Sequence, residues 1–495
     1  MSRAATVPRR FAGMIALLAA GALGGCAAGG ASAGAAEIAV PPGLPPIGKA
    51  AVEALEYPPL HFDAPPVEHF TLSNGIPVYF SPDHSLPLVR LFASFKGGPT
   101  YFGREDLAAA TALGSLLLTG GTASLPPDSI DEVVEYYALA PSAASGGARS
   151  QLGIGSLAQH FDVAIELWAD MLRHPRFDRD RVEIWRQRQI ESVRRFRDLP
   201  TSVAITTFNR VMFGDHPIGW TLRESDLTPE HLSDARLRRL HSEIFCPDHA
   251  IIGVTGDIER ESLRRALESV LAGWPPCPRE LAEPPIPKIR RGAGVLLVHR
   301  PIDQSTIILG QAGGIVMRDD PDYYASRIAN WILGAGGLSS RLVSNLRTEE
   351  GLAYQAWSVW TTGTRHERLF GAFTQTRAES TITAAREIRE ALEALRREPP
   401  TREEVRLAIE SSTNGFVFAF EDPGDVIARR ISYQAAGLPA DWLERYLDGI
   451  QEVSPEDVRS VIARYIRPSE LTLVIVGDTT RFHLPPDLFG PRITQ

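Results

Sequence analysis

The sequence predicts an α+β protein of two homologous domains, each with an antiparallel-rich sheet covered by helices. One observation is a long-range repeat: residues 239–257 and 459–478 both read as a helix end, a Pro break, a β-branched strand and a Gly-Asp pair. Another is that 106–121 (DLAAATALGSLLLTGG) parallels 322–337 (DYYASRIANWILGAGG) at nearly the same offset. Two such parallels indicate a duplicated domain of about 220 residues.

Strand and helix patterns in the first half fit this fold class. Residues 76–80 and 88–95 read as strands, and they precede long helical patterns at 161–173 and 178–197. Strands that come before long helices are typical of an antiparallel sheet covered by helices. A Pro-rich, charged segment, 274–291, has the composition of a linker between domains.

The predicted organisation follows from these boundaries. It consists of a signal peptide, a flexible tether, an N-terminal domain, a linker, a C-terminal domain and a tail, at residues 1–25, 26–66, 67–273, 274–291, 292–480 and 481–495. The tether prediction depends on an Ala/Gly/Ser stretch followed by a Pro-rich one.

The N-terminus has the pattern of a bacterial lipoprotein signal. A basic region is followed by the apolar run 11–23, and Leu23-Gly24-Gly25-Cys26 matches a lipobox. We expect cleavage before Cys26 and lipidation of that residue, because the apolar run is too short for a transmembrane helix. An ordinary secretory signal with an incidental Cys is the alternative. By analogy with other lipoproteins, Ala27 favours the outer membrane, on the periplasmic side.

Composition excludes some functions. The apolar fraction of 44% is that of a globular protein with a normal core. The formal charge is −9, and removal of the three Arg of the signal makes it −12, which argues against nucleic acid as a partner. Beyond Cys26, the chain has Cys246 and Cys277. An oxidising compartment permits a bridge between them, but the sequence does not give their distance.

The most informative segment is 334–354, GAGGLSSRLVSNLRTEEGLAY. It reads as a Gly-rich turn, an amphipathic helix, a Gly stop and the start of a strand. The apolar residues at helical spacing are Leu338, Leu342, Val343 and Leu346. Gly351 stands where a helix end favours a residue with positive φ. Arg347 and Tyr354 flank this Gly.

This segment closely resembles the C-terminal-domain signature of the insulinase/pitrilysin family of zinc peptidases. In that family, the Arg and Tyr of an R-x6-Y pair face the substrate at the zinc. Further segments match the family in order and spacing over 66–480: 72–75 (LSNG), 175–177, 213–219 (FGDHPIG) and 254–257. The resemblance implies an insulinase-like fold, similar to that of mitochondrial processing peptidase, with the two domains forming half of a clam-shell.

The zinc motif of the family is absent from its matching place. Zinc peptidases of this type need His-x-x-Glu-His on a helix and a further Glu about 75 residues later. Counting back from the turn at Gly121-Thr122 puts Ala112, Ser115 and Leu116 at the three motif positions. None of them can bind zinc or accept the proton of a zinc-bound water. Glu191 lies near the distal position but one residue out of register, and we interpret it as a solvated helix residue.

No other cluster replaces this site. The sequence has 12 His but contains neither HExxH nor HxxEH. His241, Cys246 and His249 come nearest to ligand spacing, but the repeat explains their segment structurally. We interpret His216 as a turn residue. Ser115 lacks the G-x-S-x-G elbow of a serine nucleophile. We therefore expect no metal on this chain.

The resemblance implies a function. In several bacterial members two different chains pair, one with HxxEH and one that lacks it but supplies Arg and Tyr. We expect this chain to be the second kind, binding peptide substrates in the bacterial envelope beside a zinc-bearing partner, as a heterodimer or a dimer of heterodimers. Tyr354 would donate a hydrogen bond to the developing oxyanion, and Arg347 would hold a substrate carbonyl. Residues 145–156 correspond to the edge strand onto which family members add the substrate.

Two alternatives stay open. The chain could be a structural or peptide-binding scaffold without associated proteolysis, like the core subunits of respiratory complexes that share this fold. It could also be an active homodimeric peptidase with a displaced metal site. The sequence does not give the substrate, the cleavage preference or the partner's identity.

Overall fold

The computed structural model describes residues 65–349, 351, 353–418, 420, 422–485 and 488–493; for 347–349, 354, 417 and 418 it describes the backbone alone. The predicted signal peptide and most of the tether, with Cys26, lie outside these residues. None of the described helices combines the length and the apolar composition that crossing a bilayer requires.

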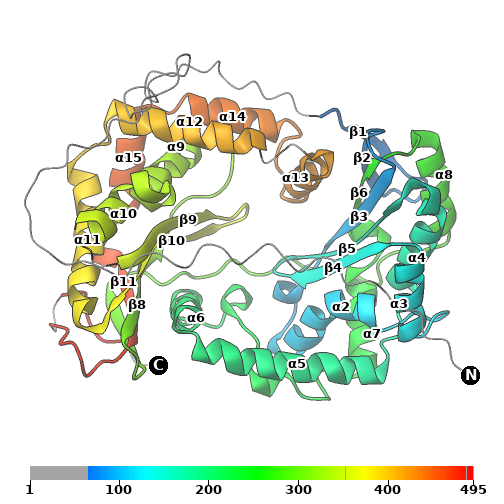
Figure 1. Cartoon of the computed structure of the whole chain (residues 1–495), viewed down its shortest axis with the longest axis horizontal. Helices are drawn as coiled ribbons and strands as arrows, with labels where there is room; N and C mark the ends of the chain where they lie inside the picture. The colour runs from blue at the N-terminus through cyan, green and yellow to red at the C-terminus, as the bar shows by residue number, and fades with distance from the viewer. Residues whose placement is uncertain are drawn as a thin grey trace, which may run out of the picture. The chain divides into compact units, whose positions relative to one another are not determined.

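The chain forms two sheets whose strands follow the same order (Figure 1). The first sheet runs β1 (Glu68–Thr71), β2 (Pro77–Pro82), β6 (Ala250–Gly256), β3 (Leu88–Lys96), β5 (Arg149–Leu157) and β4 (Ala140–Gly146). The second runs β7 (Gly294–His299), β11 (Thr472–Gly477), β8 (Gln304–Ala312), β10 (Glu367–Arg377) and β9 (Ala353–Thr362). In both, the pair that contains the last strand of its half is parallel, β2 with β6 and β7 with β11. The other described pairs are antiparallel. The predicted duplicated α+β fold is confirmed.

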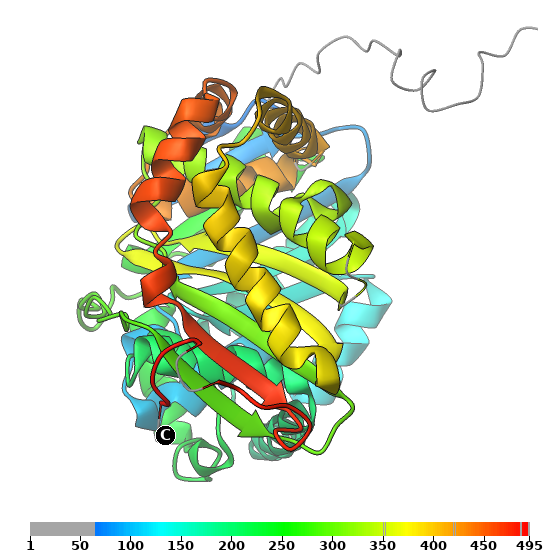
Figure 2. The same cartoon turned by 90° about the vertical axis from the view of Figure 1, so that its left-hand side faces the viewer.

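Helices accompany each sheet. The helices of the first half are α2 (Leu107–Thr119), α3 (Pro127–Tyr136), α4 (Phe161–Arg173), α5 (Arg179–Asp198), α6 (Pro200–Phe213), α7 (Asp234–Ile244) and α8 (Arg260–Val270). Those of the second half are α9 (Pro321–Asn330), α10 (Arg341–Val343), α11 (Thr381–Arg397), α12 (Arg402–Phe418), α13 (Pro423–Ala435), α14 (Trp442–Gln451) and α15 (Pro455–Tyr465). Figure 2 shows α11 (yellow) lying over the strands of the second sheet, where it contacts β8 and β10.

Apolar patterning explains which helix lies deepest. Most of the residues of α2, from Leu107 to Leu117, are buried. A helix that is apolar around most of its circumference must be covered on all sides, and α2 contacts β4 on one side and α5 and α7 on others. The amphipathic α8 instead buries only Leu263 and Leu267. The side chains of α2 thus belong to the core of the first half.

The two halves exchange one helix each. The helix α6 of the first half packs on β8 and β11 of the second sheet, where Phe208 and Met212 join a cluster with Ile308 and Val474. The helix α13 of the second half packs on β2 and β6 of the first sheet through Ile427. Because of this exchange two smaller apolar clusters contain residues from both halves, and the described residues from 65 onward belong to one compact unit.

The predicted linker connects α8 to β7 without a helix or strand of its own, since α8 ends at Val270 and β7 begins at Gly294. It is fixed at several points. Cys277 forms a disulfide with Cys246, which answers the question that the sequence left open. Glu283 binds Lys96 of β3 at 2.9 Å and Arg365, between β9 and β10, at 3.0 Å. The linker is therefore attached to both halves.

Candidate functional site

The three degenerate motif positions, which were counted back from the turn at Gly121-Thr122, lie on α2. Ala112 and Leu116 are fully buried in the core of the first half, and Ser115 is half-buried. The helix lies tightly on β4 because Gly114 has no side chain: a Cβ there would be 2.6 Å from the backbone nitrogen of Ser145. The side chains of Ala112, Ser115 and Leu116 include no imidazole or carboxylate that could bind zinc. In this chain α2 is therefore a core helix.

The region of the distal ligand agrees with this. Glu191 projects from α5 with its side chain 66% exposed and pairs with Arg195 one turn later at 3.6 Å. That is the environment of a solvated helix residue, as we interpreted it. Near the motif positions, α5 presents Gln189, Ser192 and Val193 to a cavity that Thr111 of α2 also lines.

The segment that carries Arg347 is less regular than its pattern predicts. A continuous amphipathic helix was expected, but a 3-10 turn at Gly337–Ser339 precedes α10, and π-helical geometry follows over Ser344–Glu349. Leu342, Val343 and Leu346 are buried as predicted. Leu338 is 67% exposed instead, because it lies in the turn before the helix begins at Arg341.

Arg347 and Tyr354 lie at irregular positions of the backbone. Arg347 lies within the π-helical segment, a geometry that is frequent at functional sites. Gly351 has φ of 59°, which confirms the predicted helix stop. In β9, Gln355 pairs with Gln375 while Ala353 pairs with Thr376, so Tyr354 is the extra residue of a β-bulge. A bulge re-aims side chains and bends its strand.

The edge strand of the first sheet differs from our prediction. Residues 145–156 contain the end of β4, the following turn and most of β5, and β5 is paired on both sides, with β3 and with β4. The edge is therefore β4, Ala140–Gly146, in which every side chain is small or Pro. In the second sheet β9 is the edge at the corresponding place. Both edges have a side without a β-partner among the described strands.

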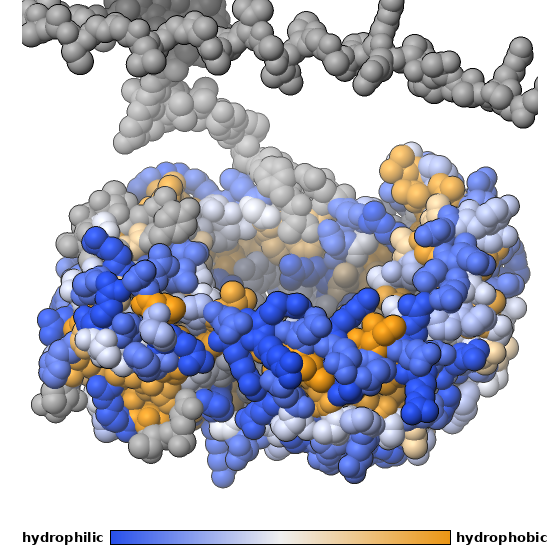
Figure 3. Space-filling view, turned by 60° about the horizontal axis from the view of Figure 1, so that its bottom comes forward, coloured by the Kyte–Doolittle hydropathy of each residue, from blue (hydrophilic) through white to orange (hydrophobic). Residues whose placement is uncertain are grey.

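A cavity of about 700 Å³ opens beside α2. The elements that line it are α2, α5, α6, the end of β4, the segment from Pro217 to Arg223, and the end of β7. Figure 3 shows a hollowed surface bordered largely by hydrophilic side chains. This space adjoins both the degenerate motif helix and the end of the open edge β4.

A buried ionic network positions α2. Asp106, which precedes the helix, accepts hydrogen bonds from Arg236 and Arg239 of α7, at 2.6 Å from Arg239. Glu243, also buried, binds Arg279 of the linker at 2.8 Å. Buried carboxylates need such partners to offset their desolvation. The network therefore fixes the start of α2 against α7 and the linker.

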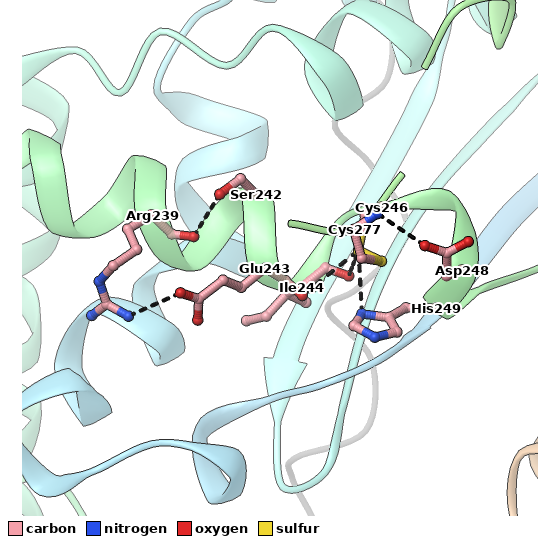
Figure 4. Close-up of a disulfide and its surroundings, with 8 residues drawn as sticks. All are labelled: Arg239, Ser242, Glu243, Ile244, Cys246, Asp248, His249 and Cys277. Atoms are coloured by element: carbon pink, nitrogen blue, oxygen red, sulfur yellow. Dashed lines mark hydrogen bonds and ion pairs between the residues drawn. A yellow bond between two sulfur atoms is a disulfide. The ribbon is translucent and has the colours of Figure 1, made fainter. Parts of the chain in front are cut away.

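The sequence has its nearest approach to metal-ligand spacing at His241, Cys246 and His249. In the fold, Cys246 and His249 lie together with Cys277 instead of His241. His241 is buried, stacks on Phe245, and its Nε2 lies 2.9 Å from the Leu172 carbonyl oxygen. Burial lowers the pKa of His241 to about 4. The cluster that does form joins His249 to the disulfide, with His249 Nδ1 3.3 Å from Cys246 Sγ (Figure 4). Sulfur atoms joined in a disulfide are not thiolates, and thiolates are what metals bind.

His216 has the turn role that we expected. Its Nδ1 accepts a hydrogen bond from the backbone nitrogen of Ile218 at 3.2 Å. Its Nε2 lies 2.7 Å from the carbonyl oxygen of Pro285 in the linker. Both ring nitrogens are therefore engaged by the backbone.

Comparison with known proteins places these features in a family. Residues 231–412 match the family described as peptidase M16 inactive domain. An uncharacterized zinc protease of Streptomyces coelicolor is 26% identical over 320 residues, which are 64% of this chain and 69% of that protein. A Helicobacter pylori protein named a non-peptidase homolog is 19% identical over 404 residues, 81% of this chain and 92% of that protein.

A solved structure from Pseudomonas fluorescens, described as a peptidase M16 inactive domain, has the same fold. Its TM-score is 0.74 at 22% sequence identity, and the match covers 84% of this chain and 98% of that chain. The duplicated sheets, the segments that match in order and the family match over residues 231–412 agree with one another. The chain belongs to the insulinase/pitrilysin (peptidase M16) family, as a homologue that lacks HxxEH but keeps the Arg and Tyr of the R-x6-Y pair.

Proposed function

We propose that the chain is the non-catalytic, substrate-binding subunit of a heterodimeric zinc metallopeptidase. The observation that carries this proposal is selective loss: the three motif positions are Ala112, Ser115 and Leu116, whereas Arg347 and Tyr354 are retained. Arg and Tyr without a zinc site are useful if a second chain, one with HxxEH, supplies the metal. The zinc would polarise the scissile carbonyl and activate water on that partner.

Two backbone features support a role in binding peptide. The edges of β4 and β9 can add an extended peptide through main-chain hydrogen bonds. Tyr354 lies at a bulge on one of these edges, and bulges are frequent next to active sites. In this role, the Tyr354 hydroxyl would donate a hydrogen bond to the oxyanion, and the Arg347 guanidinium would bind a substrate carbonyl.

The lipobox at Cys26 supports a location of the reaction in the bacterial envelope. A lipid on this residue would anchor the chain to a membrane of the bacterial envelope, facing the periplasm, and Ala27 favours the outer membrane. The disulfide between Cys246 and Cys277 is compatible with an oxidising compartment. The substrates would then be peptides in the envelope.

The proposal is tested by pulling the tagged chain from an envelope extract of its own organism. We expect recovery of a homologue that carries HxxEH, together with peptidase activity that a zinc chelator abolishes. Recovery of the chain alone, free of metal and inactive, would contradict the proposal. A matched extract from a strain without the tag controls for background peptidases.

A second candidate is a structural or peptide-binding scaffold without associated proteolysis. The naming of the Helicobacter pylori relative as a non-peptidase homolog favours it. The same pull-down separates the two candidates, because a scaffold would bring down envelope proteins without chelator-sensitive activity.

A further inference from the structure

All the charged side chains that line the cavity beside α2 are arginines. Arg197 of α5, Arg210 of α6, Arg223 and Arg300 line it, and the described lining residues include no Asp, Glu or Lys. The chain as a whole carries a formal charge of −9. Four guanidinium groups around one cavity of an acidic protein therefore form a local field of the opposite sign, which attracts anions.

Three of these arginines have no acidic partner. Arg197 pairs with Glu224 at 3.4 Å. Over the described part of the chain, the guanidinium groups of Arg210, Arg223 and Arg300 form no ion pair with a carboxylate, and all three residues are exposed. The backbone nitrogen of Arg223, by contrast, donates to Asp226 at 2.8 Å. The adjoining recess of about 100 Å³ is lined by one acidic residue, Asp215. The cationic charge of the cavity is thus largely uncompensated.

Several hydroxyl groups of the cavity have protein partners already. Thr100 Oγ1 donates to the Gly147 carbonyl oxygen at 2.8 Å, and Thr111 Oγ1 donates to Leu107 at 2.7 Å. Thr206 Oγ1 donates to Ser202 at 2.8 Å in the same way. These protons are engaged, and the guanidinium groups are the charged donors that the cavity offers to a ligand. A planar guanidinium binds carboxylate in a two-point arrangement.

The position of the cavity connects it to an extended peptide. Ser145 and Gly146, the last residues of the open edge β4, line the cavity. A peptide that adds to β4 would therefore bring one end, or a side chain near that end, to the arginines. Apolar surface for neighbouring side chains is provided by Val193, Phe196 and Trp220.

We propose that this cavity binds a carboxylate of the peptide held on β4, so that the subunit selects peptides that present a carboxylate at this place. The inference rests on the proposed function, because it assumes that peptides reach β4. Arg210 from the first half and Arg300 from the second, which both line the cavity, bind the carboxylate. The carboxylate belongs to an Asp or Glu side chain or to the peptide's C-terminus, and the experiment distinguishes these sources.

Fluorescence anisotropy with the purified chain in detergent tests the proposal. Three labelled eight-residue peptides share one Ala/Ser/Val background: one with two Asp and blocked ends, one with Asn in their place and blocked ends, and the Asn peptide with a free C-terminal carboxylate. We expect a carboxylate-bearing peptide to bind about tenfold more tightly than the blocked Asn peptide. Preference for the first identifies a side chain, and preference for the third identifies the C-terminus.

Variants locate the effect. The double variant Arg210→Gln/Arg300→Gln should bind all three peptides equally. Arg188→Gln should keep the preference, because Arg188 is an exposed α5 residue that neither lines the cavity nor has an ion pair in the described structure. Both are surface substitutions, and equal thermal melting confirms that folding is intact.

Equal binding of all peptides by the wild-type chain, no binding of any peptide at millimolar concentration, or an equal loss of preference in Arg188→Gln would each overturn the cavity's role. The pull-down described above is independent of peptide charge. Failure of the cavity proposal with a zinc-bearing partner still recovered therefore leaves the divided peptidase intact.

Discussion

Arg341 and Glu404 form a two-point ion pair, with Arg341 Nε 2.6 Å and Nη2 2.8 Å from the two carboxylate oxygens. Glu404 also accepts hydrogen bonds from the backbone nitrogen and the hydroxyl of Thr401, at the start of α12. Arg341 begins the short helix that leads to Arg347. The pair therefore attaches the segment that carries Arg347 to α12.

Glu404→Gln should destabilise the chain by about 1–2 kcal/mol, because it weakens a half-buried, charge-assisted pair and the cap of α12. Glu403→Gln is the matched control, since Glu403 pairs with Arg406 in solvent and should change stability by less than about 0.5 kcal/mol. Urea denaturation followed by circular dichroism measures both. Equal effects of the two substitutions would show that the Arg341 pair adds nothing.

His241 should make stability depend on pH. Burial lowers its pKa to about 4, whereas the unfolded chain has the ordinary value near 6.5. Between these values the unfolded state binds the additional proton, so stability falls as pH decreases from about 6.5 to 4. His241→Gln can keep a donor for the Leu172 carbonyl but does not titrate, and its melting temperature should fall less over this range. Parallel pH profiles for the two proteins would contradict the assignment.

Reduction of the disulfide should destabilise the first half. Cys246 and Cys277 are separated by 31 residues, and closing a loop of that length contributes roughly 3–4 kcal/mol in the chain-entropy account. The double variant Cys246→Ser/Cys277→Ser should lose this stability, and a reducing agent should lower the melting temperature of the wild type but not of the variant. A reductant effect that persists in the variant would place its cause elsewhere.

Because α13 packs on the first sheet, we expect Ala substitutions at two glycines of that sheet to differ sharply in their effect on stability. A Cβ at Gly253 would be 2.6 Å from both Ile427 of α13 and Phe92, whereas a Cβ at Gly155 has its nearest atom at 3.5 Å. Gly253→Ala should therefore cost about 1–3 kcal/mol and increase proteolysis near α13, and Gly155→Ala should cost much less. Limited proteolysis with mass spectrometry compares the two. Equal digestion patterns would contradict the packing of α13 on the first sheet.

Much of the fold could be predicted because it depends on local patterns that occur twice. The strands at 76–80 and 88–95 and the helices at 161–173 and 178–197 match β2, β3, α4 and α5 to within two residues at each end. The exchange of α6 and α13 could not be predicted. Helical periodicity shows that one face is buried, but it does not show which sheet buries it.

The candidate site could be predicted by position but not by geometry. Counting back from Gly121 located the motif positions on α2. Gly351 located the end of the helical segment that carries Arg347. The prediction of the edge strand was wrong because β4 consists of Ala, Ser, Pro and Gly, a composition with little alternation of apolar and polar residues. The cationic cavity was missed because its arginines come from α5, α6, the Arg223 segment and the end of β7, and only the tertiary fold brings them together.

We propose that Tyr354 acts on a reaction whose metal lies in another chain. The most direct measurement is kcat/KM of the recovered pair with Tyr354→Phe, beside Tyr136→Phe as a control on an exposed Tyr of α3. We expect kcat/KM to decrease about 10²–10³-fold for Tyr354→Phe, with unchanged co-purification of the partner and no effect of the control. Arg347→Ala should also lower activity without loss of the partner. Unchanged kcat/KM in both Tyr354→Phe and Arg347→Ala would contradict the claim.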